Sequence, residues 1–234
     1  MISETFVVDA NDAALLHRLG YRFRDPTLLE AALTHRSAGG VNNERLEFLG
    51  DAILGLVIAD EIYRLRPHDP EGDLSRLRAT LVRGSSLAKI GGEIGIGAHL
   101  RMGSGERRSG GFRRSSMLAD ALEALFGAVY CDGGFEPAAG LIRSLFAARL
   151  AHLPAADTLK DPKTRLQEWL QGQGRPLPEY TQVEVSGADH ARQFVMRCRL
   201  TDQHTHADGE GVSRRSAEQA AARKLFEHVT DSDH

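Results

Sequence analysis

Apolar residues recur every three to four positions through the first 150 residues of the chain, and every second position in part of the remainder. Leu46, Leu49 and Ile53 are typical of the first pattern, which predicts helices, and no persuasive strand pattern occurs before residue 150. Residues 180–186 and 193–200 alternate between apolar and polar side chains, which predicts two strands. The expected fold is therefore an all-α domain followed by a small α+β domain.

Capping residues predict where the helices of the first part begin. Three such positions precede apolar periodic segments: Asp25 before Pro26, Asn42 or Asn43, and Asp73. The remaining expectations for this part are a short helix over residues 13–19, a Gly/Arg/Ser loop over 103–115, and helices over about 116–131 and 137–150.

The second part has the predicted order α-β-β-β-α. Its first helix starts at Asp161, a weak third strand lies near residues 205–209, and the last helix starts at about Ser213. The residues expected to share one strand face are Thr181, Val183 and Val185 in the first strand and Phe194, Met196, Cys198 and Leu200 in the second. A short polar segment, LPAADTLK, separates the two parts. The predicted domains are 1–152 and 161–230, joined by a linker over 153–160.

Composition narrows the class of protein. Of 234 residues, 41% are hydrophobic and 26% charged, which is typical of a globular protein and excludes a disordered regulator or a fibrous protein. The two cysteines indicate no disulfide framework, so both are expected to be reduced thiols. No signal-peptide pattern precedes the first helix, and the longest apolar run, residues 52–59, is too short for a membrane span. We expect a soluble cytoplasmic protein that does not bind membranes.

The chain has a small net charge, but its basic residues gather in one segment. The net charge is −3, and residues 160–234 contain 11 Lys and Arg against 12 Asp and Glu, so neither domain is basic as a whole. Residues 101–116, however, contain five arginines and a single carboxylate, Glu106. Because phosphate binding depends on where charges lie, this distribution suits a protein that holds both a metal ion and a polyanion.

Two helices predicted to be strongly apolar also contain carboxylates at helical spacing. Glu44, Glu47 and Asp51 share one stripe, and Asp120 and Glu123 lie three residues apart on the other helix. No Lys or Arg lies one turn away from Glu47 or Asp51. An arbitrary pair of this kind is usually a solvated surface, but solvated faces mix charge signs, since like charges at this spacing repel.

Unpaired carboxylates on apolar helices point to a cation. Carboxylates that face one another raise each other's pKa unless a cation neutralises them. Oxygen ligands without a nearby His or Cys favour Mg²⁺ or Mn²⁺ over zinc. Such a site suits phosphodiester hydrolysis.

The chain resembles the bacterial ribonuclease III family over nearly its whole length. The matching segments, in collinear order, are LTHRS (Leu33 to Ser37), NERLEFLGDAIL (Asn43 to Leu54), EGDLSRLRATLVRG (Glu71 to Gly84), GGFRRSSMLADALEALFGAVY (Gly110 to Tyr130) and DPKTRLQEWLQG (Asp161 to Gly172). The resemblance implies an all-helical, homodimeric endonuclease domain joined to a double-stranded-RNA-binding domain. It also implies Mg²⁺-dependent cleavage of duplex RNA to 5′-phosphate and 3′-hydroxyl ends with short 3′ overhangs. The implied substrates are ribosomal RNA precursors and some messenger and transfer RNAs.

The same resemblance implies roles for individual residues of the nuclease domain. The expected metal ligands are Glu47, Asp120 and Glu123. Asp51 and Glu123 are expected to position or activate the attacking water, with Glu44 and Glu71 in support, although Glu71 also fits plain helix-start chemistry. Phe48, at the edge of the acidic stripe, is expected to enter a socket on the partner subunit; the alternative is a Phe packed within its own chain.

RNA contacts are expected from both domains. In the small domain, Thr164, Gln167 and Glu168 would reach 2′-hydroxyls, His190 would enter the next minor groove, and Arg214 and Arg215, with Lys224, would bind phosphates. In the nuclease domain, the arginine-rich loop with Arg107, Arg108, Arg113 and Arg114 would steer the RNA backbone toward the carboxylates. A solvated surface is the alternative for both arginine groups.

Two other classes of protein fit part of the sequence. A regulator that binds double-stranded RNA without cutting it would need the second domain alone. An all-helical Mg²⁺-dependent nucleotide pyrophosphohydrolase would use the acidic helices but leaves the second domain unexplained.

Overall fold

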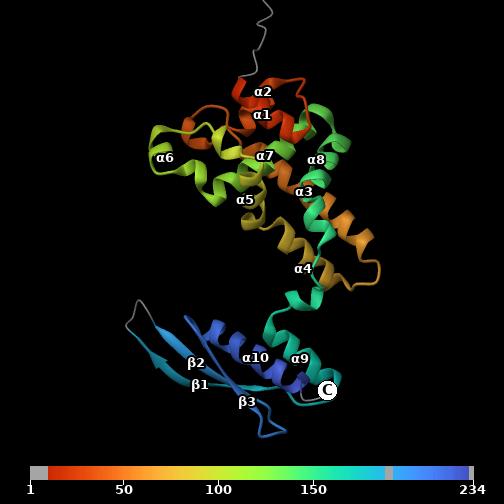
Figure 1. Cartoon of the computed structure of the whole chain (residues 1–234), viewed down its shortest axis with the longest axis vertical. Helices are drawn as coiled ribbons and strands as arrows, with labels where there is room; N and C mark the ends of the chain where they lie inside the picture. Colours follow the sequence, from red (N-terminus) through yellow and green to blue (C-terminus); the bar gives the residue numbers. More distant parts are fainter. Residues whose placement is uncertain (1–9, 188–191, 232–234) are drawn as a thin grey trace, which may run out of the picture. The chain divides into compact units, whose positions relative to one another are not determined.

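The computed structural model describes residues 10–187 and 192–231 (Figure 1). The chain divides into two compact units, with the boundary between Pro154 and Ala155. The first unit is helical and the second contains a three-stranded sheet, so the predicted all-α and α+β classes are confirmed. None of the described helices has the length and apolar character needed to cross a membrane.

The first unit is built around one central helix. Its helices are α1 (Ala10–Leu19), α2 (Pro26–Ala32), α3 (Glu44–Leu65), α4 (Glu71–Val82), α5 (Gly84–Glu93), α6 (Ser104–Arg108), α7 (Ser115–Gly133) and α8 (Phe135–Ala151). Helix α7 packs against α2, α3, α5 and α8, and its middle residues are almost all buried (Figure 1). The long apolar helix predicted there therefore forms the core of this unit.

Helix starts follow local capping, with one correction. The Asp25 side chain accepts a hydrogen bond from the backbone N–H of Thr27, and Asn42 Oδ1 accepts one from Glu44 N at 3.1 Å. The predicted cap at Asp73 is wrong. The carbonyl of Pro70 already accepts bonds from Asp73 and Leu74, so the cap lies three residues earlier, at Pro70, and Asp73 lies in the first turn of α4.

Two further parts of the first unit differ from the sequence expectation. The segment 84–93 forms α5, which the apolar pattern did not indicate because it contains three glycines. The predicted loop over 103–115 contains helix α6 and a 3-10 turn, Gly111–Arg113. Backbone hydrogen bonds, such as the one that Arg107 N donates to the Gly103 carbonyl, satisfy groups that would bond to water in a loop.

The second unit has the predicted α-β-β-β-α order. Its elements are α9 (Pro162–Gly172), β1 (Glu179–Ser186), β2 (Gln193–Arg199), β3 (His206–Gly211) and α10 (Arg214–Asp231). The strands form an antiparallel sheet in the order β1-β2-β3. Helix α10 packs on β2 and β3 and also against α9, which places the core between helices and sheet.

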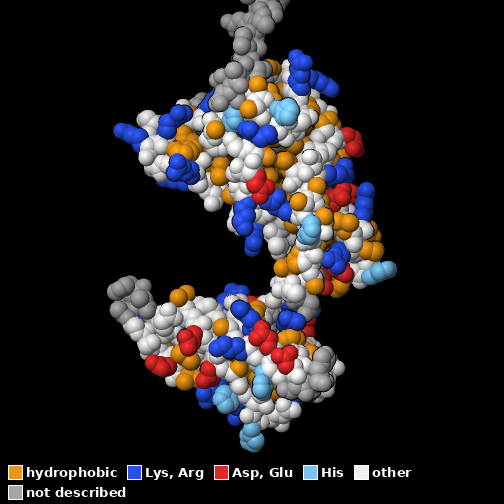
Figure 2. Space-filling model, in the orientation of Figure 1, with side chains coloured by type: hydrophobic (Ala, Val, Ile, Leu, Met, Phe, Trp, Pro, Cys, Tyr) orange, Lys and Arg blue, Asp and Glu red, His pale blue; other side chains and the backbone are white. Residues whose placement is uncertain are grey.

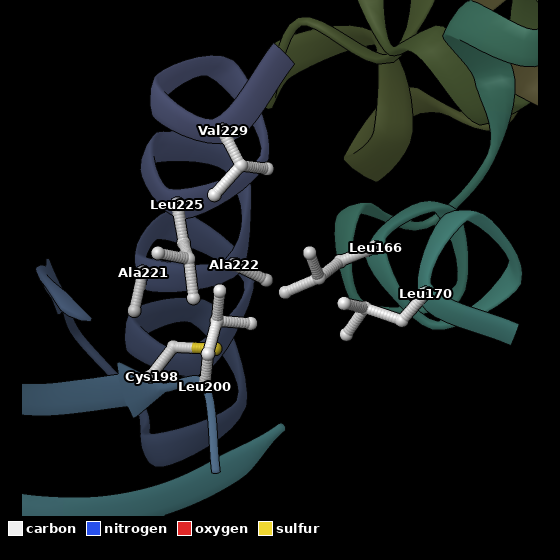
Figure 3. Close-up of a cluster of buried hydrophobic side chains, with 8 residues drawn as sticks. All are labelled: Leu166, Leu170, Cys198, Leu200, Ala221, Ala222, Leu225 and Val229. Atoms are coloured by element: carbon white, nitrogen blue, oxygen red, sulfur yellow. The ribbon is translucent and has the colours of Figure 1, made fainter. Parts of the chain in front are cut away.

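The core of this unit contains side chains from α9, α10 and the second strand. Figure 3 shows Leu166 and Leu170 of α9 facing Ala222 of α10, next to Cys198 and Leu200. The predicted inward face of β2 is therefore confirmed at Met196, Cys198 and Leu200, all of which are buried.

The shared face predicted for Thr181, Val183 and Val185 in β1 is wrong. The pairing register of β1 with β2 shifts between Gln182 and Glu184, so Thr181 pairs with Arg197 whereas Val185 pairs with Phe194, on the other face of the sheet. Val183 and Val185 are 49% and 40% exposed. Only Tyr180 of β1 packs against the core, where it is half-buried.

Candidate active site

A close crossing of α3 and α7 builds the site. A Cβ atom added at Gly50 would lie 1.8 Å from the carbonyl oxygen of Glu123, and one added at Gly127 would lie 2.2 Å from that of Leu46. Only glycine fits at either position, so the two helix backbones are almost in contact. This contact brings the carboxylates of the two helices together, although they are some 70 residues apart in sequence.

Three carboxylates form a compact cluster at this crossing. One oxygen each from Glu47, Asp120 and Glu123 lies within 4.8 Å of the other two, and all three residues are half-buried. The cluster lies in a cleft of about 730 Å³ that Asp51 and Glu44 also line. The structure therefore brings together all five predicted acidic residues of α3 and α7.

The site is electrostatically strained without a cation. Burial, followed by the charges of Asp51, Glu47 and Asp120, raises the pKa of Glu123 from 4.5 to about 8. Burial also raises the pKa of Glu47, with Asp120 as the next cause. Burial raises the pKa of Asp120 as well, against the opposing effect of His35 and Arg36.

The donor set fits a hard divalent cation. Among the described residues no ion pair joins Glu47, Asp120 or Glu123 to a basic side chain, so their charge is left without a partner in the protein. The three oxygens lie close enough to share one ion, and neither His nor Cys belongs to the cluster. Carboxylates of this kind bind Mg²⁺ or Mn²⁺ through one to three protein oxygens and leave other positions to water or phosphate.

The cleft is also lined by residues to which the sequence gave no role. His35, Arg36 and Ser37 line the cleft, and so does Asn43. His35 Nδ1 accepts from the backbone N–H of Ser37 at 3.1 Å, which fixes the ring. His35, Arg36 and Ser37 belong to the LTHRS segment and Asn43 to NERLEFLGDAIL, but neither periodicity nor charge pattern marked these four residues as part of the site.

The supporting acidic residues lie in two different places. Glu44 is exposed on the rim of the cleft and forms an ion pair with Arg36 at 3.5 Å. Glu71 lies in the first turn of α4, accepts a hydrogen bond from Ser75, and lines a separate apolar pocket with Leu56. The fold of one chain does not bring Glu71 into the cleft.

Phe48 is an unusual neighbour for a set of carboxylates. Its side chain lines the cleft and is 80% exposed. A large aromatic ring left in solvent is costly. Phe48 is therefore not a residue of its own chain's core, which was the alternative to a contact with a partner.

The predicted RNA-steering arginines divide between the cleft and its surroundings. Arg114 lines the cleft and forms an ion pair with Glu106 at 2.7 Å. Arg107 lines a separate small pocket, Arg108 bonds to the Ser104 carbonyl, and Arg113 stacks on its neighbouring aromatic ring. Figure 2 shows Lys and Arg side chains gathered on the part of the first unit that carries α6.

The predicted RNA-contact residues of the second unit lie on exposed parts of its two helices. Thr164, Gln167 and Glu168 share the outward face of α9, and Glu168 pairs with Lys160 at 2.6 Å. Arg214 and Arg215 are exposed in the first turn of α10. Lys224 donates to the Asp208 carbonyl on β3. His190 lies outside the described residues.

Family comparisons agree with this division of the chain. A family model described as Ribonuclease-III-like matches residues 25–150, and one described as Double-stranded RNA binding motif matches residues 162–229. A protein of Alkalilimnicola ehrlichii named Ribonuclease 3 is 59% identical, and one of Vibrio cholerae with the same name is 51% identical. Each alignment covers 93% of this chain and 96% of the relative.

Solved structures agree for the first unit. The nuclease domain of ribonuclease III from Campylobacter jejuni, solved in a study of flexibility in its dimer-forming region, is 43% identical with a TM-score of 0.59. That likeness covers 61% of this chain and all of the other. A nucleotide pyrophosphohydrolase accounts for neither family match, and relatives named as nucleases do not support a regulator that leaves RNA uncut. The chain belongs to the ribonuclease III family and is an endoribonuclease that combines a nuclease domain with a domain for double-stranded RNA.

Proposed function

We propose that the protein cuts double-stranded RNA in a Mg²⁺-dependent reaction, leaving 5′-phosphate and 3′-hydroxyl ends with short 3′ overhangs. The carboxylate cluster of Glu47, Asp120 and Glu123 supports this proposal most directly, because three desolvated oxygens within 4.8 Å of one another favour a divalent cation. Mn²⁺ has the same ligand preferences and is expected to substitute for Mg²⁺.

The residues of the cleft have two roles: some bind the ion, and others orient the attacking water. A divalent ion at such a site polarises a phosphoryl oxygen and makes water more acidic. Glu47, Asp120 and Glu123 hold the ion. Asp51, exposed on the same cleft, and Glu123, with its raised pKa, orient the attacking water and accept its proton. Glu44 and Glu71 act in support.

RNA is held by both domains in this proposal. Residues 1–152 form the nuclease domain, 153–160 the linker and 161–230 the RNA-binding domain; the family matches and the boundary at Pro154 support these limits. A-form RNA is read through its shallow minor groove and its phosphates. The contacts are 2′-hydroxyls for Thr164, Gln167 and Glu168, the next minor groove for His190, and phosphates for Arg214, Arg215, Arg107, Arg108, Arg113 and Arg114.

The protein acts as a homodimer. A two-fold dimer supplies one carboxylate site for each strand of a duplex, which accounts for cleavage of both strands. The exposed ring of Phe48 supports a contact with a second copy, as does the dimer formation named for the Campylobacter jejuni nuclease domain.

Replacing the exposed ring tests the dimer. Phe48→Ser is expected to shift the protein from dimer to monomer in sedimentation equilibrium, because burying the ring stabilises the contact by about 1.5–3 kcal/mol. Val212→Ser, which removes an equally exposed apolar residue from the second unit, is the matched control and should leave the dimer intact. A monomeric wild type, or a dimer unchanged by the Phe48 substitution, would contradict this role.

The substrates follow from the family. We propose ribosomal RNA precursors and some structured messenger and transfer RNAs, cut in the cytoplasm.

Product analysis tests the proposed reaction. The purified chain is incubated with a long RNA duplex, or with either single strand, in Mg²⁺ or in chelator. We expect short duplexes only from the duplex in Mg²⁺, with 5′ ends that accept a kinase label only after phosphatase treatment. Binding without cleavage in both Mg²⁺ and Mn²⁺, or cleavage of the single strands, would contradict the proposal.

A further inference from the structure

Buried polar residues of the described chain form one connected path. Four polar or charged residues are less than 9% exposed, namely Asp12, Thr34, Asn43 and His99. Burying such groups is costly unless each finds a partner. All four lie in the first unit. The Asp12–His99 pair reaches the side chain of Arg101, and main-chain hydrogen bonds from Arg101 pass Thr34 and Asn43 and end at the first turn of α3, beside the carboxylates.

The path starts with a charged group on α1. Asp12 Oδ1 lies 3.0 Å from His99 Nδ1, and Asp12 Oδ2 lies 3.7 Å from Arg101 Nη2. Arg18 Nη2 lies 3.3 Å from His99 Nε2, and because a guanidinium only donates, Nε2 accepts. His99 Nδ1 therefore carries the proton and donates it to Asp12. The Arg101 side chain is also held from α2, by the carboxylate of Glu30.

The main chain of Arg101 continues the path. Its N–H donates to the Leu33 carbonyl at 2.8 Å, and its carbonyl accepts from His35 N at 2.8 Å. These two bonds form an isolated parallel bridge between Thr34 and Arg101. The segment that carries His35 and Arg36 to the cleft is thus held by a residue whose side chain forms ion pairs with Glu30 and, at 3.7 Å, with Asp12.

The last part of the path reaches a proposed metal ligand. The Thr34 carbonyl accepts from Asn43 N at 2.9 Å, and the Asn43 carbonyl accepts from Glu47 N at 2.8 Å. The buried path therefore ends at the backbone of Glu47. Residues that orient metal ligands from outside are usually worth 10–100-fold in metal affinity or activity.

We propose that Asp12 and His99 are positioning residues of the nuclease site. They fix Arg101, whose main chain sets the position of His35 and, through Thr34 and Asn43, of the first turn of α3 with Glu47. Helix α1 thereby takes part in shaping a cleft that it does not line. This inference rests on the proposed role of the carboxylates as metal ligands.

Two readouts on the full chain test the proposal. In Asp12→Ala we expect the Mg²⁺ affinity measured by calorimetry to fall about tenfold, at the lower end of the range for residues that orient ligands. In chelator, the amide hydrogens of His35 and Arg101 should exchange faster with solvent. The second readout needs no metal, so it still decides the positioning role if the wild type binds no Mg²⁺ and the proposed function fails.

A matched control separates positioning from loss of stability. Leu15→Ala removes a fully buried apolar side chain from the same helix and leaves every hydrogen-bonding group of the polar path in place. It should lower the melting temperature while leaving the Mg²⁺ affinity at the wild-type value. Asp12→Asn keeps an acceptor for His99 and should recover most of the affinity. His99→Leu removes the other member of the pair and replaces Asp12→Ala if the latter does not fold; it should lower the Mg²⁺ affinity in the same way. Equal Mg²⁺ affinity and equal amide exchange in the Asp12 and Leu15 variants would overturn the proposal.

Discussion

Glu123 has the most strongly raised pKa of the three clustered carboxylates. It is half-buried on the most buried helix of the nuclease domain, and three other carboxylates raise its pKa after burial has done so. Desolvation destabilises the ionised carboxylate when no cation is bound, and it also strengthens the attraction between this carboxylate and a cation. A residue in this position titrates near neutral pH and suits both ion binding and proton transfer.

This shift predicts a pH-dependent stability. Glu123 ionises near pH 4.5 in the unfolded chain and near pH 8 in the metal-free fold, so the folded state binds more protons between these values. The free energy of unfolding in chelator should therefore fall as pH rises from about 4.5 to 8. Glu123→Gln removes this contribution, so it should raise the melting temperature at pH 8.5 far more than at pH 4.5. An equal effect at both pH values would contradict the raised pKa.

The crossing of α3 and α7 determines the site at the scale of elements. Gly50 and Gly127 each lie against a backbone carbonyl of the other helix, so a side chain at either position must push the helices apart. Glu47 and Glu123 lie one turn from Gly50 and Gly127, and they would separate with the helices. Small residues at the crossing are therefore part of the site, although neither glycine has a chemical role.

Adding one methyl group tests this arrangement. Gly50→Ala should destabilise the protein by at least about 1–3 kcal/mol in chemical denaturation, because its Cβ overlaps a carbonyl that cannot move without its helix. It should also lower the Mg²⁺ affinity. Gly55→Ala, in the same helix with open space around it, is the control and should stabilise by about 0.5–1 kcal/mol. Similar effects of the two substitutions would show that the close crossing is unimportant.

Sequence patterns predicted elements better than they predicted contacts. The stripe of Glu47 and Asp51 and the pair on α7 followed from helical spacing, because spacing alone fixes which side chains share a face. The approach of His35 to Asp120 depends on a parallel bridge between residues 67 positions apart, which no local pattern encodes. The shared face of Thr181 and Val185 in β1 was mispredicted for a similar reason, since a bulge depends on the partner strand.

At the scale of the whole molecule, we expect RNA binding and RNA cleavage to depend on different residues. Two of the arginines assigned to phosphates, Arg214 and Arg215, belong to one compact unit, and the carboxylates belong to the other. Affinity for duplex RNA comes largely from phosphate contacts and depends steeply on salt. The two units should therefore respond to different substitutions.

Arg214→Gln combined with Arg215→Gln tests this separation. We expect a higher KM, an unchanged kcat, and a shallower dependence of RNA affinity on salt by about one unit of slope for each lost phosphate contact. The control is Arg199→Gln, which removes an exposed arginine of β2 that pairs with Glu179 at 2.7 Å. A loss of kcat without a change in affinity would show that these arginines do not bind RNA.

Single-turnover cleavage by Glu123→Gln tests the central claim most directly. The variant keeps the size of the side chain but removes its charge, and Glu93→Gln, on α5 outside the cleft, is the matched control. With saturating protein and Mg²⁺, Glu123→Gln should bind duplex RNA like the wild type and cut at least about 100-fold more slowly. The control should cut at the wild-type rate. Cleavage by Glu123→Gln at the wild-type rate would place the chemistry outside the cleft between α3 and α7.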